Sequence, residues 1–185
     1  MKQFISSLLL LFLVASCTKK SELAVIFNCT TSESFNNLEK VTDVKELFTV
    51  QLPKHWKTNL YFDAAQTSIY SADTTKQLTE TTLIDVNFLY KNVDFNSDFK
   101  EKIRLKAKLY QLNETRSKEL LFLEKPSYIS ILKGKKGDFD YQAFTLYVKV
   151  NESNTLLIKT EVYGDSLVDN RFCKAIKLIE KIAIK

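Results

Sequence analysis

The residues that could carry out catalysis are few and widely separated. The chain of 185 residues contains one histidine, His55, which stands beside Trp56 shortly after Pro53. A serine or cysteine nucleophile needs a neighbouring base, and the sequence has no Gly-x-Ser-x-Gly turn to expose a catalytic serine. We therefore expect His55 to be a turn residue, with Trp56 as a plug beneath that turn. No residue is assigned a catalytic role, and we expect the protein not to be an enzyme.

Paired carboxylates are the one enzymatic alternative. A glycoside hydrolase needs two acidic side chains about 5 Å or about 6.5 to 9.5 Å apart in a cleft. Asp63, Glu80, Asp85 and Glu161 could converge once the chain folds, although their spacing does not require it. A carboxylate-dependent envelope hydrolase is therefore the alternative to a binding role.

Metal and cofactor sites lack their usual ligand patterns. One histidine, three cysteines and no aspartate-rich calcium loop supply no cluster of metal-ligand spacing. The glycines, at positions 134, 137 and 164, form neither a phosphate-binding loop nor a dinucleotide fingerprint. We expect no bound metal and no cofactor.

The chemistry that the sequence does favour is acylation of a cysteine. Lys2 precedes an apolar run from Phe4 to Ala15, which is typical of a signal peptide and shorter than the roughly 20 residues of a membrane span. Val14-Ala15-Ser16-Cys17 resembles the bacterial lipobox. The resemblance implies cleavage before Cys17 and attachment of fatty-acid chains such as palmitate, and two or more chains hold a protein on a membrane stably. The alternative is an ordinary secretory signal.

The chain divides into three parts by composition. We expect a lipoprotein signal peptide at 1–16, a lipidated tether at 17–43 and a single domain at 44–185. The tether is polar apart from an apolar patch, 23–27, which is consistent with a short strand. Export would place Cys29 and Cys173 in an oxidising compartment, where cysteines commonly pair. The residues alone leave open whether these two form a disulfide or Cys29 stays free.

The net charge of +5 is modest and spread along the chain. This distribution argues against a nucleic-acid partner, because nucleic-acid binding needs clustered basic residues. The length suits one domain with a single core. Composition does not indicate an oligomeric state.

Alternation of apolar and polar residues predicts two groups of strands separated by a helix. The first group lies at 48–52, 59–63, 67–72 and 82–90. The helix begins near Asp98, which forms a capping box with Glu101, and carries apolar residues at helical spacing, including Phe99, Ile103, Ala107, Leu105, Leu109 and Tyr110. The second group lies at 119–124, 128–133, 139–150 and 156–163, with a break at Pro126 and a turn at 134–138.

A second amphipathic helix closes the chain after Gly164. Its apolar stripe, which must lie on the sheet, comprises Phe172, Ala175, Ile176, Ile179 and Ile182. Asp165, Ser166 and Asp169 are candidate caps for its first turn.

A basic ridge is expected on the first helix. Lys100, Arg104 and Lys108 recur at four-residue intervals on the side away from its apolar residues. As an interaction ridge it would attract anionic lipid or an acidic partner; the alternative is an ordinary solvated face.

The order of elements around "LPKHWK" resembles the PsbP-like fold, which photosystem II accessory proteins share with a small Ran-binding nuclear-import factor. The segments 48–56 and "YGDSLVDNRFCKAI", 163–176, also resemble small lipoproteins of Bacteroidota whose function is not established. This resemblance covers about 44–185. It implies an α+β domain in which an antiparallel meander sheet is flanked by two amphipathic helices, and it brings no catalytic residue.

Together these features predict a lipid-anchored protein of the cell envelope that acts as a non-catalytic binding or assembly module. Its membrane contact would be the lipid on Cys17, and its partner a protein or another envelope component. Thr18 directly after that cysteine favours the outer membrane by resemblance to known sorting behaviour, whereas the face of the membrane is not indicated.

Overall fold

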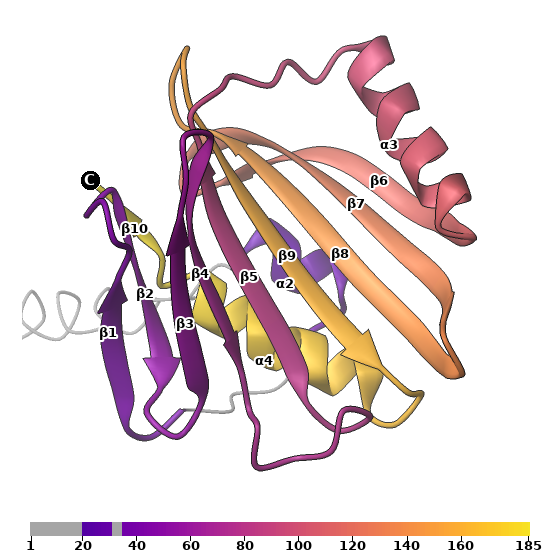
Figure 1. The fold of residues 1–185 in the computed structure, drawn as a ribbon. Helices are drawn as coiled ribbons and strands as arrows, with labels where there is room; N and C mark the ends of the chain where they lie inside the picture. The colour runs from indigo at the N-terminus through magenta and orange to yellow at the C-terminus, as the bar shows by residue number, and fades with distance from the viewer. Residues whose placement is uncertain (1–19, 31–34) are drawn as a thin grey trace, which may run out of the picture.

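The computed structural model describes residues 20–30 and 35–185. These residues form a large antiparallel sheet, a small sheet and three helices (Figure 1). In chain order the elements are α2 (Glu22–Ile26), β1 (Leu38–Thr42), β2 (Phe48–Pro53), β3 (Lys57–Phe62), β4 (Gln66–Ala72), β5 (Thr82–Leu89), α3 (Ser97–Leu109), β6 (Leu112–Phe122), β7 (Lys125–Lys136), β8 (Phe139–Lys149), β9 (Thr155–Tyr163), α4 (Val168–Ile179) and β10 (Ala183–Ile184).

The large sheet has seven antiparallel strands in the order β3-β4-β5-β9-β8-β7-β6. After β5 the chain crosses through α3 to the far edge of the sheet, and β6 to β9 return as a meander until β9 pairs with β5. Strands β1, β2 and β10 form the small sheet. The predicted α+β architecture, an antiparallel sheet flanked by amphipathic helices, is confirmed.

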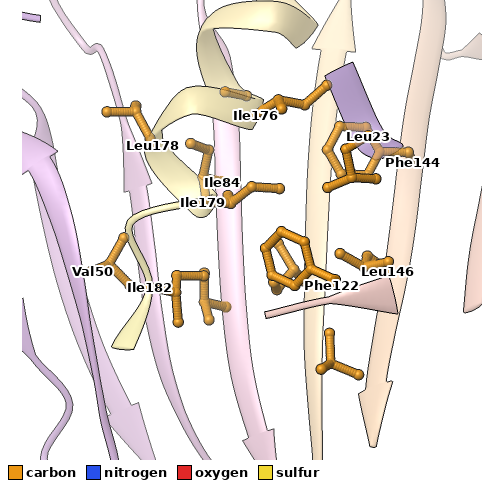
Figure 2. Packing of buried hydrophobic residues seen from close by; sticks show 14 of the residues in the cluster. Leu23, Val50, Ile84, Phe122, Phe144, Leu146, Ile176, Leu178, Ile179 and Ile182 are labelled. Carbon is orange, nitrogen blue, oxygen red and sulfur yellow. The ribbon is translucent and has the colours of Figure 1, made fainter. Parts of the chain in front are cut away.

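The main core lies between the large sheet and α4. Side chains of alternating residues on β5, β8 and β9 point to this inner face, and the apolar stripe of α4 packs on them (Figure 2). Ile84, Phe144, Leu146 and Ile179 are each no more than 1% exposed. Burial of such side chains is the main source of folding free energy. The period-two and helical patterns therefore predicted this face correctly.

The domain begins earlier in the chain than position 44. The patch expected as a strand is the short helix α2, in which the Ser21 hydroxyl accepts a hydrogen bond from Ala24 N at 3.1 Å. Leu23 is 1% exposed and packs in the main core. β1, also in the expected tether, pairs with β2, and Asp43 closes the turn between them by accepting hydrogen bonds from Leu47 N and Phe48 N. The described parts of the segment 17–43 thus belong to the folded domain.

Both long helices start differently from the prediction. The N-cap of α3 is Asn96, whose side chain accepts a hydrogen bond from Phe99 N at 2.9 Å, rather than Asp98. The N-cap position of α4 is Leu167, which has a left-handed backbone with φ of 50° and no side-chain capping hydrogen bond. The asparagine two residues before Asp98 is an equally good cap; nothing in the sequence marks Leu167 as one.

Two turns also lie elsewhere than expected. Pro126 is inside β7 opposite Leu121, and the hairpin turns at Leu123 and Glu124, which both have positive φ. Paired positive φ values suit a two-residue hairpin, but residues other than glycine or asparagine give little sign of them. Gly134, expected in a turn, lies within β7 opposite Leu112. Leu112 packs so closely there that a β-carbon at position 134 would be 2.8 Å from Leu112 Cδ2.

The helix α3 packs on the opposite, outer face of the sheet, over β6, β7 and β8. Phe99 meets Tyr128 and Tyr147 edge-on, with ring centroids 5.5 Å and 5.0 Å apart. Ala107 is buried in a second, smaller cluster. The sheet covers only the flank of α3 that carries Phe99 and Ala107. Leu109 is therefore 78% exposed, although the apolar spacing had suggested a broad buried face.

Candidate functional site

A cavity of about 530 Å³ lies where three segments meet at one end of the molecule, and we call it the α4 cleft. The segments are the β2–β3 turn, the β4–β5 loop and the first turns of α4. Its lining combines aromatic, cationic and acidic side chains, including Phe35, Trp56, His55, Lys76, Arg171, Lys174, Asp73, Glu80, Ser166 and Asn170.

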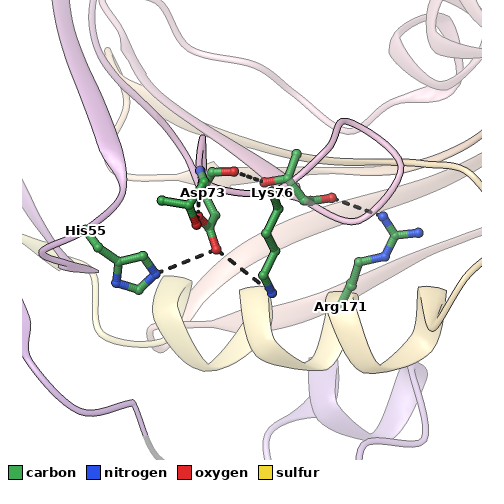
Figure 3. A network of polar contacts seen from close by, with 6 residues as sticks. His55, Asp73, Lys76 and Arg171 are labelled. Atoms are coloured by element: carbon green, nitrogen blue, oxygen red, sulfur yellow. Dashed lines mark hydrogen bonds and ion pairs between the residues drawn. The ribbon is translucent and has the colours of Figure 1, made fainter.

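Asp73 organises one wall of the α4 cleft (Figure 3). Its carboxylate accepts hydrogen bonds from Thr75 N at 3.1 Å and Thr75 Oγ1 at 2.6 Å. It also lies 3.6 Å from His55 Nε2 and 3.9 Å from Lys76 Nζ. Burial opposes ionisation of Asp73, but the Thr75 hydrogen bonds and the neighbouring His55 and Lys76 side chains outweigh it and lower its pKa. The ionised carboxylate therefore holds His55 and Lys76 at the wall.

Arg171 fixes the base of the α4 cleft. The residue is 6% exposed, and its Nη1 donates hydrogen bonds to Thr81 O at 3.1 Å and Tyr163 O at 2.9 Å. Burial lowers the pKa of Arg171, whereas Asp165 and Glu80 act to raise it. The guanidinium joins α4 to the β4–β5 loop and to the end of β9 because the accepting carbonyls belong to those segments. The lining is therefore preorganised.

His55 does not form a catalytic pair with a nucleophile in the described residues. Its ring approaches Asp73, and no hydroxyl or thiol of the described residues makes a hydrogen bond to it. The side chain is 60% exposed, as expected of a turn residue. Trp56 packs partly buried against the main core, as the plug interpretation predicted, but it also lines the α4 cleft.

The four carboxylates considered from the sequence do not converge. Asp63 closes the β3–β4 turn by accepting hydrogen bonds from Ala65 N and Gln66 N. Glu80 lines the α4 cleft. Only Asp85 and Glu161 share a surface, on neighbouring strands at the outer face.

Asp85 and Glu161 have opposite pKa shifts. Burial raises the pKa of Asp85, which lines a shallow hollow of about 330 Å³ with Tyr70 and Asn87. Burial also opposes ionisation of Glu161, but the hydrogen bond from Tyr141 and the charges of Lys159 and Lys136 lower its pKa overall. The Glu161 carboxylate lies 2.5 Å from Tyr141 Oη, 2.9 Å from Lys159 Nζ and 3.2 Å from Lys136 Nζ. It is the centre of an ion-pair network.

The predicted basic ridge is largely neutralised by acids. Lys100 Nζ lies 2.6 Å from Glu119 of β6. Arg104 is 3.5 Å from both Glu101 and Glu114. Lys108 is exposed without an ion pair to a described residue. The three cations therefore do not act as one free charged row.

A disulfide joins Cys29 to Cys173 of α4, with 5.5 Å between their Cα atoms. It fixes the N-terminal segment to the inner side of the domain. Cys17 and the expected signal peptide lie outside the described residues.

Membrane-spanning helices and metal-ligand clusters are both absent from the part of the chain that the structure describes. None of its helices has the length and apolar character to cross a membrane. Residues 20–30 and 35–185 contain no group of three or more histidine, cysteine, aspartate or glutamate side chains placed to hold a metal ion.

The sequence revealed His55 and Trp56 but not the α4 cleft. Asp73 and Arg171 are 98 positions apart in the numbering and meet only through the sheet topology. Asp73 follows a strand directly, and Arg171 is a charged residue within an apolar helix stripe. A charge in such a stripe is the one local signal that could have indicated a buried polar contact.

No protein-family model matches this sequence, and no curated protein matches it as a relative. Solved structures do resemble it. Cyanobacterial PsbP (CyanoP) from Synechocystis sp. PCC 6803 has a TM-score of 0.51 at 10% identity, covering 84% of this chain and 97% of that one. The Ran-binding protein Mog1p of Saccharomyces cerevisiae has a TM-score of 0.50 at 12% identity, covering 82% and 96%.

A Bacteroides thetaiotaomicron VPI-5482 protein has a TM-score of 0.52 at 10% identity, and the match covers 81% of this chain and 49% of that one. Identities this low carry information about the fold and not about ligands. The chain therefore has an α+β fold of the PsbP-like kind.

Proposed function

We propose that this chain is a lipid-anchored protein of the cell envelope that acts as a non-catalytic binding module, with the α4 cleft as its binding site. The observation that carries the proposal is the cleft itself. Its volume of about 530 Å³ falls within the usual range of about 300 to 1,000 Å³ for ligand pockets. Aromatic and charged side chains line it together, so it can bury an apolar group and orient a polar one.

The polar groups of the α4 cleft are suited to recognition rather than to proton transfer. Asp73 is held by Thr75, and Arg171 is bonded to backbone carbonyls. Groups fixed in this way lose little conformational entropy when a ligand binds, which favours affinity. Among proteins with this fold, Mog1p is described as Ran-binding, so a binding role has a precedent on the same scaffold.

The carboxylate-dependent hydrolase has less support. Glu161 is engaged by Tyr141, Lys136 and Lys159, which favour its ionised form and occupy its oxygens. Asp85 sits in a shallow hollow whose lining does not include Glu161. A hydrolase would need both acids exposed to one substrate.

The lipid anchor would hold this domain close to the membrane. Cys17 is three positions before Lys20, the first described residue, so the connecting chain spans at most about 11 Å. The domain would therefore lie at the membrane surface. Because Thr18 directly after Cys17 resembles known sorting behaviour, we propose that this membrane is the outer membrane.

The anchor is tested by labelling cells with an alkyne fatty-acid analogue. The parent protein should incorporate the analogue and lack residues 1–16, and the Cys17→Ala variant should not be labelled. Recovery of a native product that retains Met1 and has no lipid mass on Cys17 would remove the basis for the envelope assignment.

The binding role is tested by photo-crosslinking in intact cells. A benzophenone amino acid replaces Ser166, which is exposed and lines the α4 cleft. The matched control places it at Ser153, an exposed residue in the β8–β9 turn. A reproducible adduct at Ser166 that is absent at Ser153 supports the proposal; equal or absent adducts at both positions contradict it.

A further inference from the structure

The helix α3 exposes an apolar and basic surface that its packing does not explain. Leu105 is 54% exposed and Leu109 is 78% exposed. They lie four residues apart and therefore on the same side of the helix. The flanking lysines, which are exposed and form no ion pair with a described residue, are Lys102, Lys106 and Lys108. These five residues define the α3 face.

The fold does not need this face to be apolar. The other side of α3 makes the contacts to the sheet, through Phe99 against two tyrosines and through Ala107. Lys100 and Arg104 pair with acids of β6, and Glu101 pairs with Arg104. Glu101, Glu114 and Glu119 are thus already paired with other cations. The remaining acid of α3, Asp98, is outnumbered by the three lysines, so the α3 face has a net positive charge.

The edge strand β6 contacts both α3 and the N-terminal helix α2. The helix α2 packs on the inner side of β6, where Glu22 lies 3.0 Å from Lys118 and accepts a hydrogen bond from Leu121 N. On the outer side of the same strand, Lys100 of α3 contacts Glu119. Neighbouring residues of the edge strand β6 therefore contact the starts of both helices, and Cys17 lies within about 11 Å of Lys20 by chain length.

We propose that the α3 face rests on an anionic lipid surface, with Leu105 and Leu109 at the level of the headgroups and the three lysines on lipid phosphates. The inference rests on the anchor of the proposed function, since the anchor would hold the domain at the membrane surface. Amphipathic helices that bind at membrane interfaces combine leucines with flanking lysines. An acidic protein could form ion pairs with the lysines, but it would need separate apolar residues to contact the leucines between them.

The test measures co-sedimentation of the mature chain, 17–185, carrying Cys17→Ser, with vesicles. Vesicles contain phosphatidylcholine alone or with phosphatidylglycerol. Binding should require phosphatidylglycerol. Replacing Lys102, Lys106 and Lys108 by glutamine should weaken binding about 100-fold, because each lysine near an anionic surface contributes about fivefold. Replacing Leu105 and Leu109 by serine should also weaken it.

The matched control removes the same charge elsewhere. Lys40, Lys54 and Lys57 are exposed on β1, in the β2–β3 turn and on β3, at the opposite end of the large sheet from β6. Their replacement by glutamine should change vesicle binding far less. Equal losses in both triple variants, or binding that ignores phosphatidylglycerol, would overturn the proposal.

A second readout locates the helix. A tryptophan replacing Leu109 should be quenched by brominated lipid, whereas one replacing Glu152 in the exposed β8–β9 turn should not. The opposite outcome is a lysine variant that binds vesicles as well as the parent does but loses a protein crosslink that the parent forms in cells. That result would assign the α3 face to an acidic protein and refute the lipid contact. Failure of acylation at Cys17 is measured separately by lipid mass, so it is distinguishable from failure of vesicle binding.

Discussion

On the inner face of the large sheet, Phe144 and Ile158 are completely buried beneath α4 and α2, whereas the outer face of β8 and β9 carries Tyr141, Lys159 and Glu161. The inner face is stabilised by apolar burial and by a disulfide. The outer face depends on aromatic contacts and ion pairs, and α3 covers only one end of it. The difference indicates that the inner face provides stability, while the outer face and the cleft at the end of α4 are available for contacts.

Removal of the disulfide should give the largest loss of stability on the inner face. Replacing Cys29 and Cys173 together by serine should lower the free energy of unfolding by about 4 to 5 kcal/mol, because a loop that closes over a large part of the chain restricts the unfolded state most. The two cysteines are 144 positions apart. Urea unfolding of the oxidised protein and of this double variant measures the difference.

Reduction of the parent protein by dithiothreitol is the control for serine substitution. It should reproduce the lower stability of the double variant. Identical unfolding midpoints for reduced and oxidised parent would show that the bridge adds no stability to the inner face.

A pair of phenylalanines on one strand compares the two faces directly. Phe144 is 0% exposed and contacts Phe27 and Phe172, whereas Phe139, on the same strand, is 41% exposed and faces outward. Phe144→Ala should cost about 3 to 5 kcal/mol through lost burial and the remaining cavity. Phe139→Ala should cost less than about 1 kcal/mol by the same reasoning. Costs of similar size would contradict the assignment of stability to the inner face.

The inner face was largely predictable from the sequence, and the reason is its periodicity. Ile84, Val86 and Phe88 alternate, and Phe172, Ala175 and Ile176 follow helical spacing, so each pattern determines which side is buried. The N-terminal limit was not predictable in the same way. Residues 23–27 are few and surrounded by polar residues, and their burial depends on a partner helix distant in sequence.

The α4 cleft and the coverage of the outer face depend on tertiary contacts that no local pattern encodes. Asp73 and Arg171 are brought to the same cavity by the chain topology. On α3, apolar residues occur around much of the helix, so their spacing could not show that only the flank with Phe99 and Ala107 would be covered. The pairing of Lys100 with Glu119 likewise required knowing that β6 lies beside α3.

Two acids on the outer face should respond oppositely to neutralisation. Glu161 has a lowered pKa, so its charge stabilises the fold above its ordinary value of 4.5, and this stability is lost as the pH falls through the lowered pKa. Asp85 has a raised pKa, so the fold favours its protonated form, and stability declines as the pH rises from its ordinary value of 3.8 through the raised one.

At pH 7, Glu161→Gln should therefore destabilise the protein by about 1 to 3 kcal/mol, because Tyr141 and two lysines lose a charged acceptor. Asp85→Asn should be neutral or stabilising at the same pH. Urea unfolding at pH 3.5 and pH 7 measures both effects. If Glu161→Gln were neutral at pH 7, the ion-pair network would not contribute to the outer face.

The smallest expected effect concerns the contact between α3 and the edge strand. Lys100 and Glu119 are partly exposed, with side-chain exposures of 31% and 60%, so water screens their attraction. A double-mutant cycle with Lys100→Ala and Glu119→Ala should give a coupling energy of about 0.2 to 1 kcal/mol. That value should fall with added salt, unlike the cost of Phe144→Ala. A coupling energy that is large and independent of salt would contradict this expectation. It would mean that the contact between α3 and β6 stabilises the edge of the outer face as strongly as apolar burial stabilises the inner face.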